Sequence, residues 1–507
     1  MKEVAPREDV LPSRWLGSAG AARSAVVLML VVAISGSGAA VGGSGARAAG
    51  TTARRPANPV KRENRLPGSR SWSRNQTAPP RAIEGYASEV SVLPGQRVHF
   101  HVSTAPAARY RIVLYRLGWY HGAGARVLAC IPGCKKDRQG MARLQPHPDP
   151  ATGLTRAAWP VTDTFRFRRS AVSGYFLAKL QLTSGRDRGK VTYVPLIVRA
   201  LPSRHSKILV QAAVNTWQAY NSWGGKSLYA YNSTDHVPAT HVSFDRPYTT
   251  IVRWKWEIGL VRFLERNGYD VSYTTDVNTD RRPSELRRHR LVISSGHDEY
   301  WSKTMRDAFE AARNRGTNLM FLGADIADWQ IRYEDARRTI VEYRDATADP
   351  EPNPALKTVR FRDLVPPRPQ CELLGISFEG LRSPTDPPRA YTVNPAALKD
   401  PWFKRTGFTS TGTLPDSVGY EWDAVKPGCS VPPLTILFHY AGPGPHGKPT
   451  SADAVRYVAP SGARIFSSGS LQFIWGLDNY YANRDAPPNP HLQRFMRNAL
   501  ADLTSKH

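Results

Sequence analysis

The sequence lacks several motifs on which common enzyme classes depend. It has no Gly-x-Ser-x-Gly turn, which argues against a serine hydrolase of the usual α/β type. The phosphate-binding loop Gly-x-x-x-x-Gly-Lys and the zinc motif His-Glu-x-x-His are missing, as is a Gly-x-Gly-x-x-Gly turn after a strand. Nucleotide sites, zinc-protease sites and dinucleotide sites are therefore not predicted.

Acidic residues are also scarce, with Asp+Glu 42 against Lys+Arg 69 and a formal net charge of +27. Such an excess suits binding to nucleic acid or to an anionic surface. The basic residues are scattered along the sequence, however, and no basic helix with interleaved aromatic residues is present. We interpret the charge as a solvated basic surface and predict no nucleic-acid partner.

Long apolar runs are missing beyond the N-terminus. Arg14 and Arg23 precede an apolar run at residues 25–34, and small residues follow as far as Ala48. The run is too short to cross a bilayer and fits the core of a signal peptide at residues 1–48, with an uncleaved anchor as the alternative. We expect a secreted or extracytoplasmic protein with no integral membrane span beyond this signal.

Cysteine is rare, with 4 among 507 residues. Export permits disulfides, and four cysteines allow three pairings. We expect Cys130–Cys134 within one loop and Cys371–Cys429 in the C-terminal region. Zinc binding by the first pair is the weaker alternative, because no second pair at zinc spacing follows. None of the cysteines follows an evident strand-to-helix turn, so a catalytic cysteine is not expected.

The remaining chain divides into three parts. Residues 49–82 are rich in Arg, Pro, Gly and Asn, which is typical of a disordered linker. Residues 83–200 hold short strand patterns between turn signals, which predict an immunoglobulin-like β-sandwich. Strand and helix patterns alternate in residues 205–507, so we predict a doubly wound α/β domain with a parallel sheet. Its Pro-rich residues 345–460 read as a β-rich insertion.

The most informative stretch is a strand at residues 291–294 that runs into Gly296, His297, Asp298 and Glu299 before a helix at residues 303–313. Ligands usually bind beyond the carboxyl ends of parallel strands. An imidazole can shuttle protons near neutral pH, and a carboxylate can bind a metal or act as a base. The alternative is a capped helix start, with Asp298 as the N-cap.

Two further loops are expected at the same edge of the sheet. Residues 215–231 carry Tyr220 and Tyr229, whose phenolates are hard oxygen ligands suited to ferric iron; the aromatic residues of this loop could also simply cover the sheet. Residues 323–329 carry Asp325, which could hold substrate or His297, or could cap a turn.

Several motifs resemble one known family when taken in order. They are Tyr-Arg-Leu-Gly-Trp-Tyr-His-Gly at residues 115–122, Ala-Tyr-Asn-Ser-Trp-Gly-Gly at 219–225, Gly-His-Asp-Glu-Tyr-Trp at 296–301, Phe-Leu-Gly-Ala at 321–324 and Gly-Ser-Leu-Gln at 469–472. The combination resembles the N,N-dimethylformamidase beta subunit-like family. The resemblance implies a fold like class I glutamine amidotransferases and flavodoxin, without a nucleophilic cysteine. It also implies a mononuclear iron held by two tyrosines and a glutamate, with a histidine nearby.

The matching positions assign Glu299, Tyr220 and Tyr229 to the iron and His297 to proton transfer, with Tyr175 as the alternative second tyrosine. Two positions depart from the family pattern. Asp325 stands where the family tends to have an amide, and Arg344 where it tends to have lysine. Arginine is not a neutral replacement for lysine, so the original substrate is less well predicted than the metal.

We therefore predict an exported, iron-dependent hydrolase of amide C–N bonds that acts on a small molecule or a polymer. The iron would act as a Lewis acid, with His297 as the proton carrier and Asp325 and Arg344 positioning substrate. One alternative is an exported binding protein for glycans or other polymers, without catalysis. Another is a metal-free hydrolase or isomerase acting on sugars through His297 with Asp325 or Glu299.

Overall fold

The computed structural model describes residues 58–73, 75–249, 256–382, 386–387, 389–429, 431–478 and 488–505. The predicted signal peptide at residues 1–48 lies outside the described residues, as does the beginning of the predicted linker. The rest of that linker packs against the chain: α1 (Pro59–Glu63) is capped by Asn58, and Val60 and Trp72 are buried. No helix in the described part is both long and apolar enough to cross a membrane.

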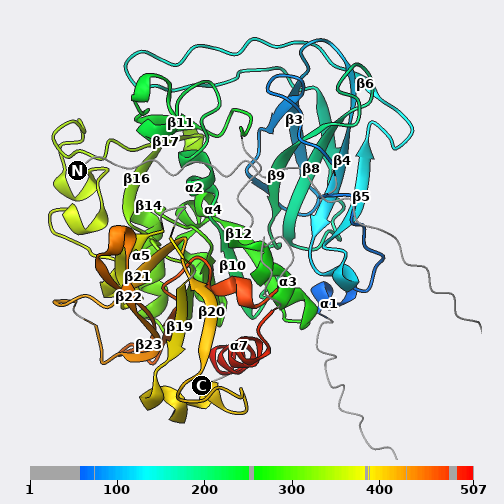
Figure 1. Cartoon of the computed structure of the whole chain (residues 1–507). Helices are drawn as coiled ribbons and strands as arrows, with labels where there is room; N and C mark the ends of the chain where they lie inside the picture. The colour runs from blue at the N-terminus through cyan, green and yellow to red at the C-terminus, as the bar shows by residue number, and fades with distance from the viewer. Residues whose placement is uncertain are drawn as a thin grey trace, which may run out of the picture. The chain divides into compact units, whose positions relative to one another are not determined.

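The N-terminal region forms two β-sheets, which lie together in Figure 1. Alternate side chains of the long strand β8 face opposite ways: Phe176 and Leu180 join the core between the two sheets, whereas Tyr175 and Leu177 join a core shared with the C-terminal region. Both faces of this strand are therefore buried. The first sheet has the order β1 (Glu84–Ala87), β3 (Arg97–Ser103) and β7 (Asp163–Arg166). The second has the order β2 (Ser91–Val92), β9 (Val191–Val198), β8 (Gly174–Leu182), β4 (Arg109–Leu117) and β5 (Ala125–Ile131), and β6 (Arg138–Gln139) pairs with β4.

A nine-stranded sheet organises the C-terminal region of the described chain. Its first five strands pair in parallel, and the other four continue the sheet in antiparallel pairs. In order across the sheet they are β12 (Val271–Thr275), β10 (Ile208–Ala212), β13 (Leu291–Ser295), β15 (Asn318–Leu322), β24 (Arg464–Ser467), β23 (Pro449–Val458), β22 (Thr435–Pro443), β19 (Arg389–Val393) and β20 (Thr413–Val418).

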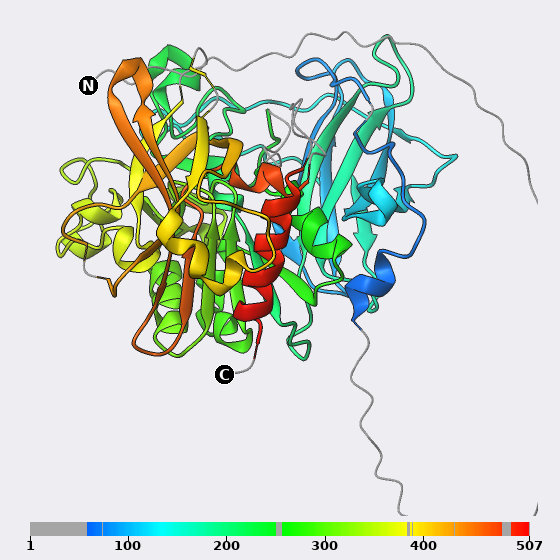
Figure 2. The same ribbon diagram turned by 60° about the horizontal axis from the view of Figure 1, so that its bottom comes forward.

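The predicted doubly wound α/β domain is therefore wrong. The described chain is mostly β, and its large sheet is mixed. The Pro-rich residues 345–460 supply β19, β20, β22 and β23, and Figure 2 shows strands of this segment in yellow and orange. Proline lacks an N–H and breaks helix interiors, which explains why this stretch adds strands in place of crossover helices. The immunoglobulin type of the N-terminal sheets is not shown by their strand pairing and stays a prediction.

Short helices connect the parallel strands. They are α2 (Val214–Ala219), α3 (Ile258–Arg266), α4 (Asp276–Arg281) and α5 (Lys303–Arg313), and α7 (Pro490–Leu503) follows later in the chain. Helix α5 has the predicted bounds, but Ser302 caps it by accepting a bond from the backbone N–H of Met305 at 3.1 Å. The prediction that Asp298 is the N-cap is wrong, because strand β14 (Tyr300–Ser302) separates the turn from the helix.

Two small sheets and two disulfides complete the region. One sheet joins β11 (His241–Ser243), β17 (Thr339–Val341), β16 (Trp329–Glu334) and β14, and the other pairs β18 (Ser377–Leu381) with β21 (Glu421–Ala424). Both predicted disulfides, Cys130–Cys134 and Cys371–Cys429, are confirmed. The second ties helix α6 (Cys371–Leu374) to the loop that follows β21.

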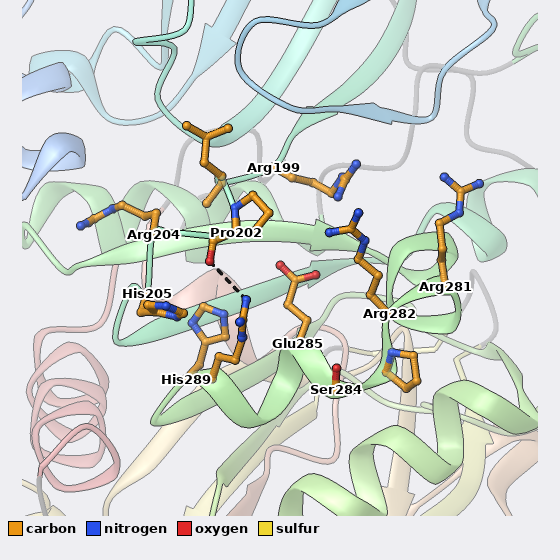
Figure 3. A pocket seen from close by; sticks show the side chains of 13 residues that line it. Arg199, Pro202, Arg204, His205, Arg281, Arg282, Ser284, Glu285 and His289 are labelled. Atoms are coloured by element: carbon orange, nitrogen blue, oxygen red, sulfur yellow. Dashed lines mark hydrogen bonds between the residues drawn. The ribbon is translucent and has the colours of Figure 1, made fainter.

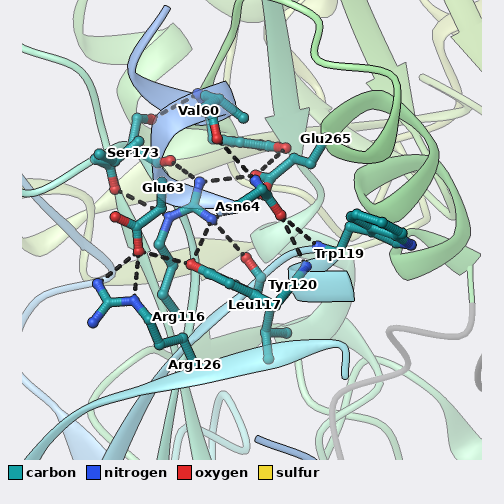
Figure 4. A network of polar contacts seen from close by, with 12 residues as sticks. Val60, Glu63, Asn64, Arg116, Leu117, Trp119, Tyr120, Arg126, Ser173 and Glu265 are labelled. Carbon is teal, nitrogen blue, oxygen red and sulfur yellow. Dashed lines mark hydrogen bonds and ion pairs between the residues drawn. The ribbon is translucent and has the colours of Figure 1, made fainter. Parts of the chain in front are cut away.

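A buried ion pair joins the N-terminal sheets to helix α3. Arg116 of β4 donates to Glu265 through two bonds, at 2.8 and 2.9 Å, and its side chain is 1% exposed against 0% for the glutamate. Glu265 also accepts a bond from Asn64 at 2.7 Å (Figure 4). The Tyr273 hydroxyl donates to the same carboxylate at 3.1 Å. Both charges are thus fully desolvated and hydrogen-bonded, which buried ions require.

Candidate active site

The candidate site lies where three parallel strands end. Strands β10, β13 and β15 are neighbours in the sheet, so their carboxyl ends meet at one edge. Tyr220 follows β10 as the C-cap residue just beyond α2, and Tyr229 lies further along the same loop. His297 and Glu299 follow β13, and Asp325 follows β15. The structure thus brings together residues from three separate loops.

Glu299 is the centre of the arrangement. Its Oε2 accepts a hydrogen bond from the Tyr220 hydroxyl at 3.0 Å, and the Tyr229 hydroxyl donates to both of its oxygens at 3.0 Å. The two tyrosine rings stack with centroids 4.2 Å apart. Tyr175, the alternative second tyrosine, lies in β8 against Tyr273, at 5.4 Å between ring centroids. The hydroxyls bonded to Glu299 thus come from the two tyrosines preferred from the sequence.

His297 lies between two carboxylates. Its Nε2 is 3.2 Å from Oε2 of Glu299 and 2.8 Å from Oε2 of Glu421. Glu421 belongs to β21, in the Pro-rich insertion, and all three side chains are buried. Sequence reasoning missed Glu421. Its local pattern, one acidic residue opening a short strand, carried no signal that it would meet His297.

Asp325 closes another side of the site. Its backbone adopts φ 52°, a left-handed conformation that costs free energy for a residue with a side chain and is frequent at functional sites. Its backbone N–H donates to Oδ1 of Asp423 at 2.8 Å, which holds this turn in place. One ligand atom from each of His297, Glu299 and Asp325 lies within 4.8 Å of the others.

Arg344 covers the tyrosine side of the cluster. Its guanidinium lies 4.2 Å from the centroid of the Tyr229 ring, and its Nε donates to Glu342 at 2.8 Å. It also donates to the Tyr300 hydroxyl, which in turn donates to the Tyr229 hydroxyl at 2.5 Å. This series of hydrogen bonds connects the Arg344 guanidinium to Glu299 through the hydroxyls of Tyr300 and Tyr229. Tyr300 and Glu342 are additional residues of the site that the sequence did not identify.

Burial governs the charge of this site. It raises the pKa of Glu299 to about 7, although His297 beside it opposes the shift. Burial also raises the pKa values of Glu342 and Asp423 to about 7 each. The pKa of Asp325 is raised well above its ordinary value by burial, and then by Asp328 and Glu299. So many buried carboxylates cannot all ionise together unless a cation accompanies them.

The donor set fits a metal ion. Carboxylates and phenols offer hard oxygen atoms, and His297 offers an imidazole nitrogen, so the donor atoms are ones that metal ions accept in proteins. The expected ligands Tyr220, Tyr229 and Glu299 are in mutual contact. The tightest group of His, Asp and Glu ligands instead combines Glu299 with His297 and Asp325. Glu299 belongs to both sets.

Asp298 has a supporting position behind the site. Its Oδ2 accepts bonds from Gln211 at 2.9 Å and from the Ser294 hydroxyl at 2.7 Å, and its side chain is fully buried. These bonds fix the turn that separates His297 from Glu299. Gly296, at φ 81°, permits the reversal that starts this turn.

Comparisons with known proteins give one family and one relative. The family model described as "N,N-dimethylformamidase beta subunit-like, C-terminal" matches residues 111–485, which include every site residue named above. The N,N-dimethylformamidase beta subunit of Paracoccus aminophilus is 23% identical over 292 residues. That stretch is 49% of this chain and 37% of the relative, so the chain spans well under half of the relative's length.

Proposed function

The chain belongs to the N,N-dimethylformamidase beta subunit-like family, and from this membership we propose that it is a metal-dependent hydrolase of amide C–N bonds. The observation that carries the proposal is the convergence of the Tyr220 and Tyr229 hydroxyls on Glu299, with His297 beside it. Tyr220, Tyr229 and Glu299 would hold a single iron, which supplies Lewis acidity toward a carbonyl oxygen and a water molecule.

The histidine is the proposed proton carrier. The His297 imidazole would take a proton from the attacking water as the new C–O bond forms, through the ring nitrogen that does not face Glu421, and would return it to the amine nitrogen as the C–N bond breaks. Glu421, 2.8 Å from Nε2, would stabilise the imidazolium between these two events and is therefore a positioning residue. Arg344 and Asp325 border the cluster and would orient the substrate.

Iron content and colour test the metal assignment. Phenolate bound to ferric iron absorbs visible light, so purified protein should be coloured after growth with iron. Tyr220→Phe and Tyr229→Phe should each weaken or shift this band, and Glu299→Gln should lower iron content. Tyr175→Phe is the matched control, because it removes a buried tyrosine hydroxyl elsewhere. Full iron and an unchanged band in the Tyr220, Tyr229 and Glu299 variants alike would overturn the assigned ligands.

Amide hydrolysis is tested by amine release from a panel of short N-alkyl amides. Activity should be lost on chelation and restored by iron. Activity that survives complete removal of iron would favour metal-free chemistry through His297 instead. Because Asp325 and Arg344 depart from the family pattern, we expect the preferred amide to differ from dimethylformamide.

We also propose export, which rests on the apolar run at residues 25–34 and on the two disulfides. Expression of the full chain followed by N-terminal sequencing of the extracytoplasmic product tests it. The mature chain should begin close to residue 49. Product retained in the cytoplasm with its original N-terminus would contradict export.

A further inference from the structure

A pocket lies at the other end of the parallel strands, away from the candidate active site. It has a volume of about 360 Å³ and opens between residues 199–205, which lead into β10, and residues 281–289, which lead into β13 (Figure 3). The candidate active site follows the carboxyl ends of the same strands. Five residues of extended chain, the length of β13, span about 16 Å. The two sites are therefore separate.

The pocket is strongly cationic. Its lining holds five arginines against one acid, Glu285; they are Arg199, Arg204, Arg281, Arg282 and Arg288. His205 and His289 also line it, and burial lowers the pKa of His289. Glu285 accepts a hydrogen bond from Asn278 at 2.7 Å, and Arg204 is paired with Asp270 outside the lining. Arg281 and Arg282 are exposed, and neither makes an ion pair with another described residue.

These positive charges repel one another at close range. Burial lowers the pKa of Arg199, Glu285 opposes the shift, and nearby Arg282 and Arg281 lower it further. Arg199 is nevertheless fixed in the wall, because its Nε donates to the Ser91 hydroxyl at 3.0 Å. A wall of repelling guanidinium groups around a hollow gains free energy when an anion enters it.

We propose that this pocket binds a small, multiply charged anion of the phosphate class, such as a diphosphate or the diphosphate group of a larger metabolite. Guanidinium groups match phosphate oxygens with two parallel bonds each, which lysine cannot do. The volume is that of a site for a small molecule. The ligand would contact both walls, and so would join the segment that enters β10 to the segment that enters β13.

Calorimetric titration of the iron-loaded protein with inorganic pyrophosphate tests this site, with ionic strength held constant by sodium chloride. The wild type should bind with one saturable site. Arg281→Gln/Arg282→Gln should weaken binding about tenfold or more, as expected for lost charged hydrogen bonds. The control Arg168→Gln/Arg169→Gln removes the same charge from two adjacent exposed arginines that do not line the pocket, and it should bind as the wild type does.

The pocket variant should keep its iron, which shows that it is folded and that the active site is intact. Three results would overturn the proposal. The wild type could bind pyrophosphate no better than chloride at equal ionic strength. The control could lose as much affinity as the pocket variant. A duplex oligonucleotide could bind the wild type more tightly than pyrophosphate does, and that binding could be lost in the pocket variant. This result would identify the surface as a nucleic-acid site.

Discussion

Nε2 of His297 lies 2.8 Å from Oε2 of Glu421, although His297 lies in the turn after β13 and Glu421 in β21, far apart in the sequence. A buried carboxylate at this distance favours the protonated imidazole. It also fixes the orientation of the ring. The pair therefore gives the proposed proton carrier a partner that the metal does not supply.

Glu421→Gln should lower the rate of amide hydrolysis by about 10²-fold while iron content and colour remain. The acidic limb of the pH–rate profile should move to lower pH, because the protonated imidazole loses its carboxylate. Glu89→Gln is the matched control, since Glu89 pairs with His99 at 2.7 Å away from the site. An unchanged profile in Glu421→Gln would remove Glu421 from the proposed mechanism.

The iron-free protein should become less stable as the pH rises toward neutrality. Burial raises the pKa values of Glu299, Glu342 and Asp423 to about 7, so the folded state holds protons that the unfolded state has already released. Stability from these groups is complete below about pH 4 and is lost as the pH passes about 7. Thermal unfolding at pH 5 and pH 8 measures the loss.

Two comparisons sharpen this pH prediction. The Glu299→Gln variant cannot ionise at that position, so its melting temperature should fall less between the two pH values. Iron should restore the wild type at pH 8, because the metal binds the deprotonated carboxylate. An equal change in melting temperature between pH 5 and pH 8 in the wild type and in Glu299→Gln would contradict the raised pKa assigned to Glu299.

Arg344→Lys should lower kcat/KM by about tenfold or more and leave the iron in place. The guanidinium contacts the Tyr229 ring, Glu342 and the Tyr300 hydroxyl at once, and a single ammonium cannot reproduce that fork. Arg360→Lys is the control, because Arg360 lies over Trp329 at 4.6 Å without a bond to these phenols. Equal losses in both variants would argue against a specific contribution of Arg344.

Arg116→Met should lower the free energy of unfolding by about 3–5 kcal/mol, because it leaves Glu265 charged, buried and without its partner. Arg116→Met/Glu265→Gln should recover part of this loss. Lys303→Met, which breaks an ion pair whose side chains are 45% and 44% exposed, should cost about 0–1 kcal/mol. Denaturant unfolding measures all three, and a similar cost for Arg116 and Lys303 would show that the buried pair contributes little.

The local patterns of the sequence predicted the edge of the site well. The bounds of α5 follow from the spacing of Met305 and Phe309, and β13 from its apolar run, because both depend on neighbouring residues. Parallel pairing of β10, β13 and β15 then places Tyr220, His297 and Asp325 at one edge. The roles assigned to these residues stay predictions.

Long-range pairing could not be predicted in the same way. Nothing in the Pro-rich stretch indicated that β23 would pair with β24 and turn a parallel sheet into a mixed one. For the same reason Glu421 was missed, since its neighbour His297 comes from another part of the chain. The cap of α5 was misassigned because the three residues of β14 are too few to give a strand pattern.

The Cys371–Cys429 disulfide links the position of Glu421 to the redox state of the surroundings. It closes a loop of 58 residues around the segment that delivers Glu421 to His297. Reduction would remove this covalent tie and leave the segment held by the pairing of β21 with β18 and by the backbone bonds of Glu421 and Asp423 to residues 469–471. Glu421 is therefore secured beside His297 by two kinds of link, of which only the covalent one depends on the redox state of the surroundings.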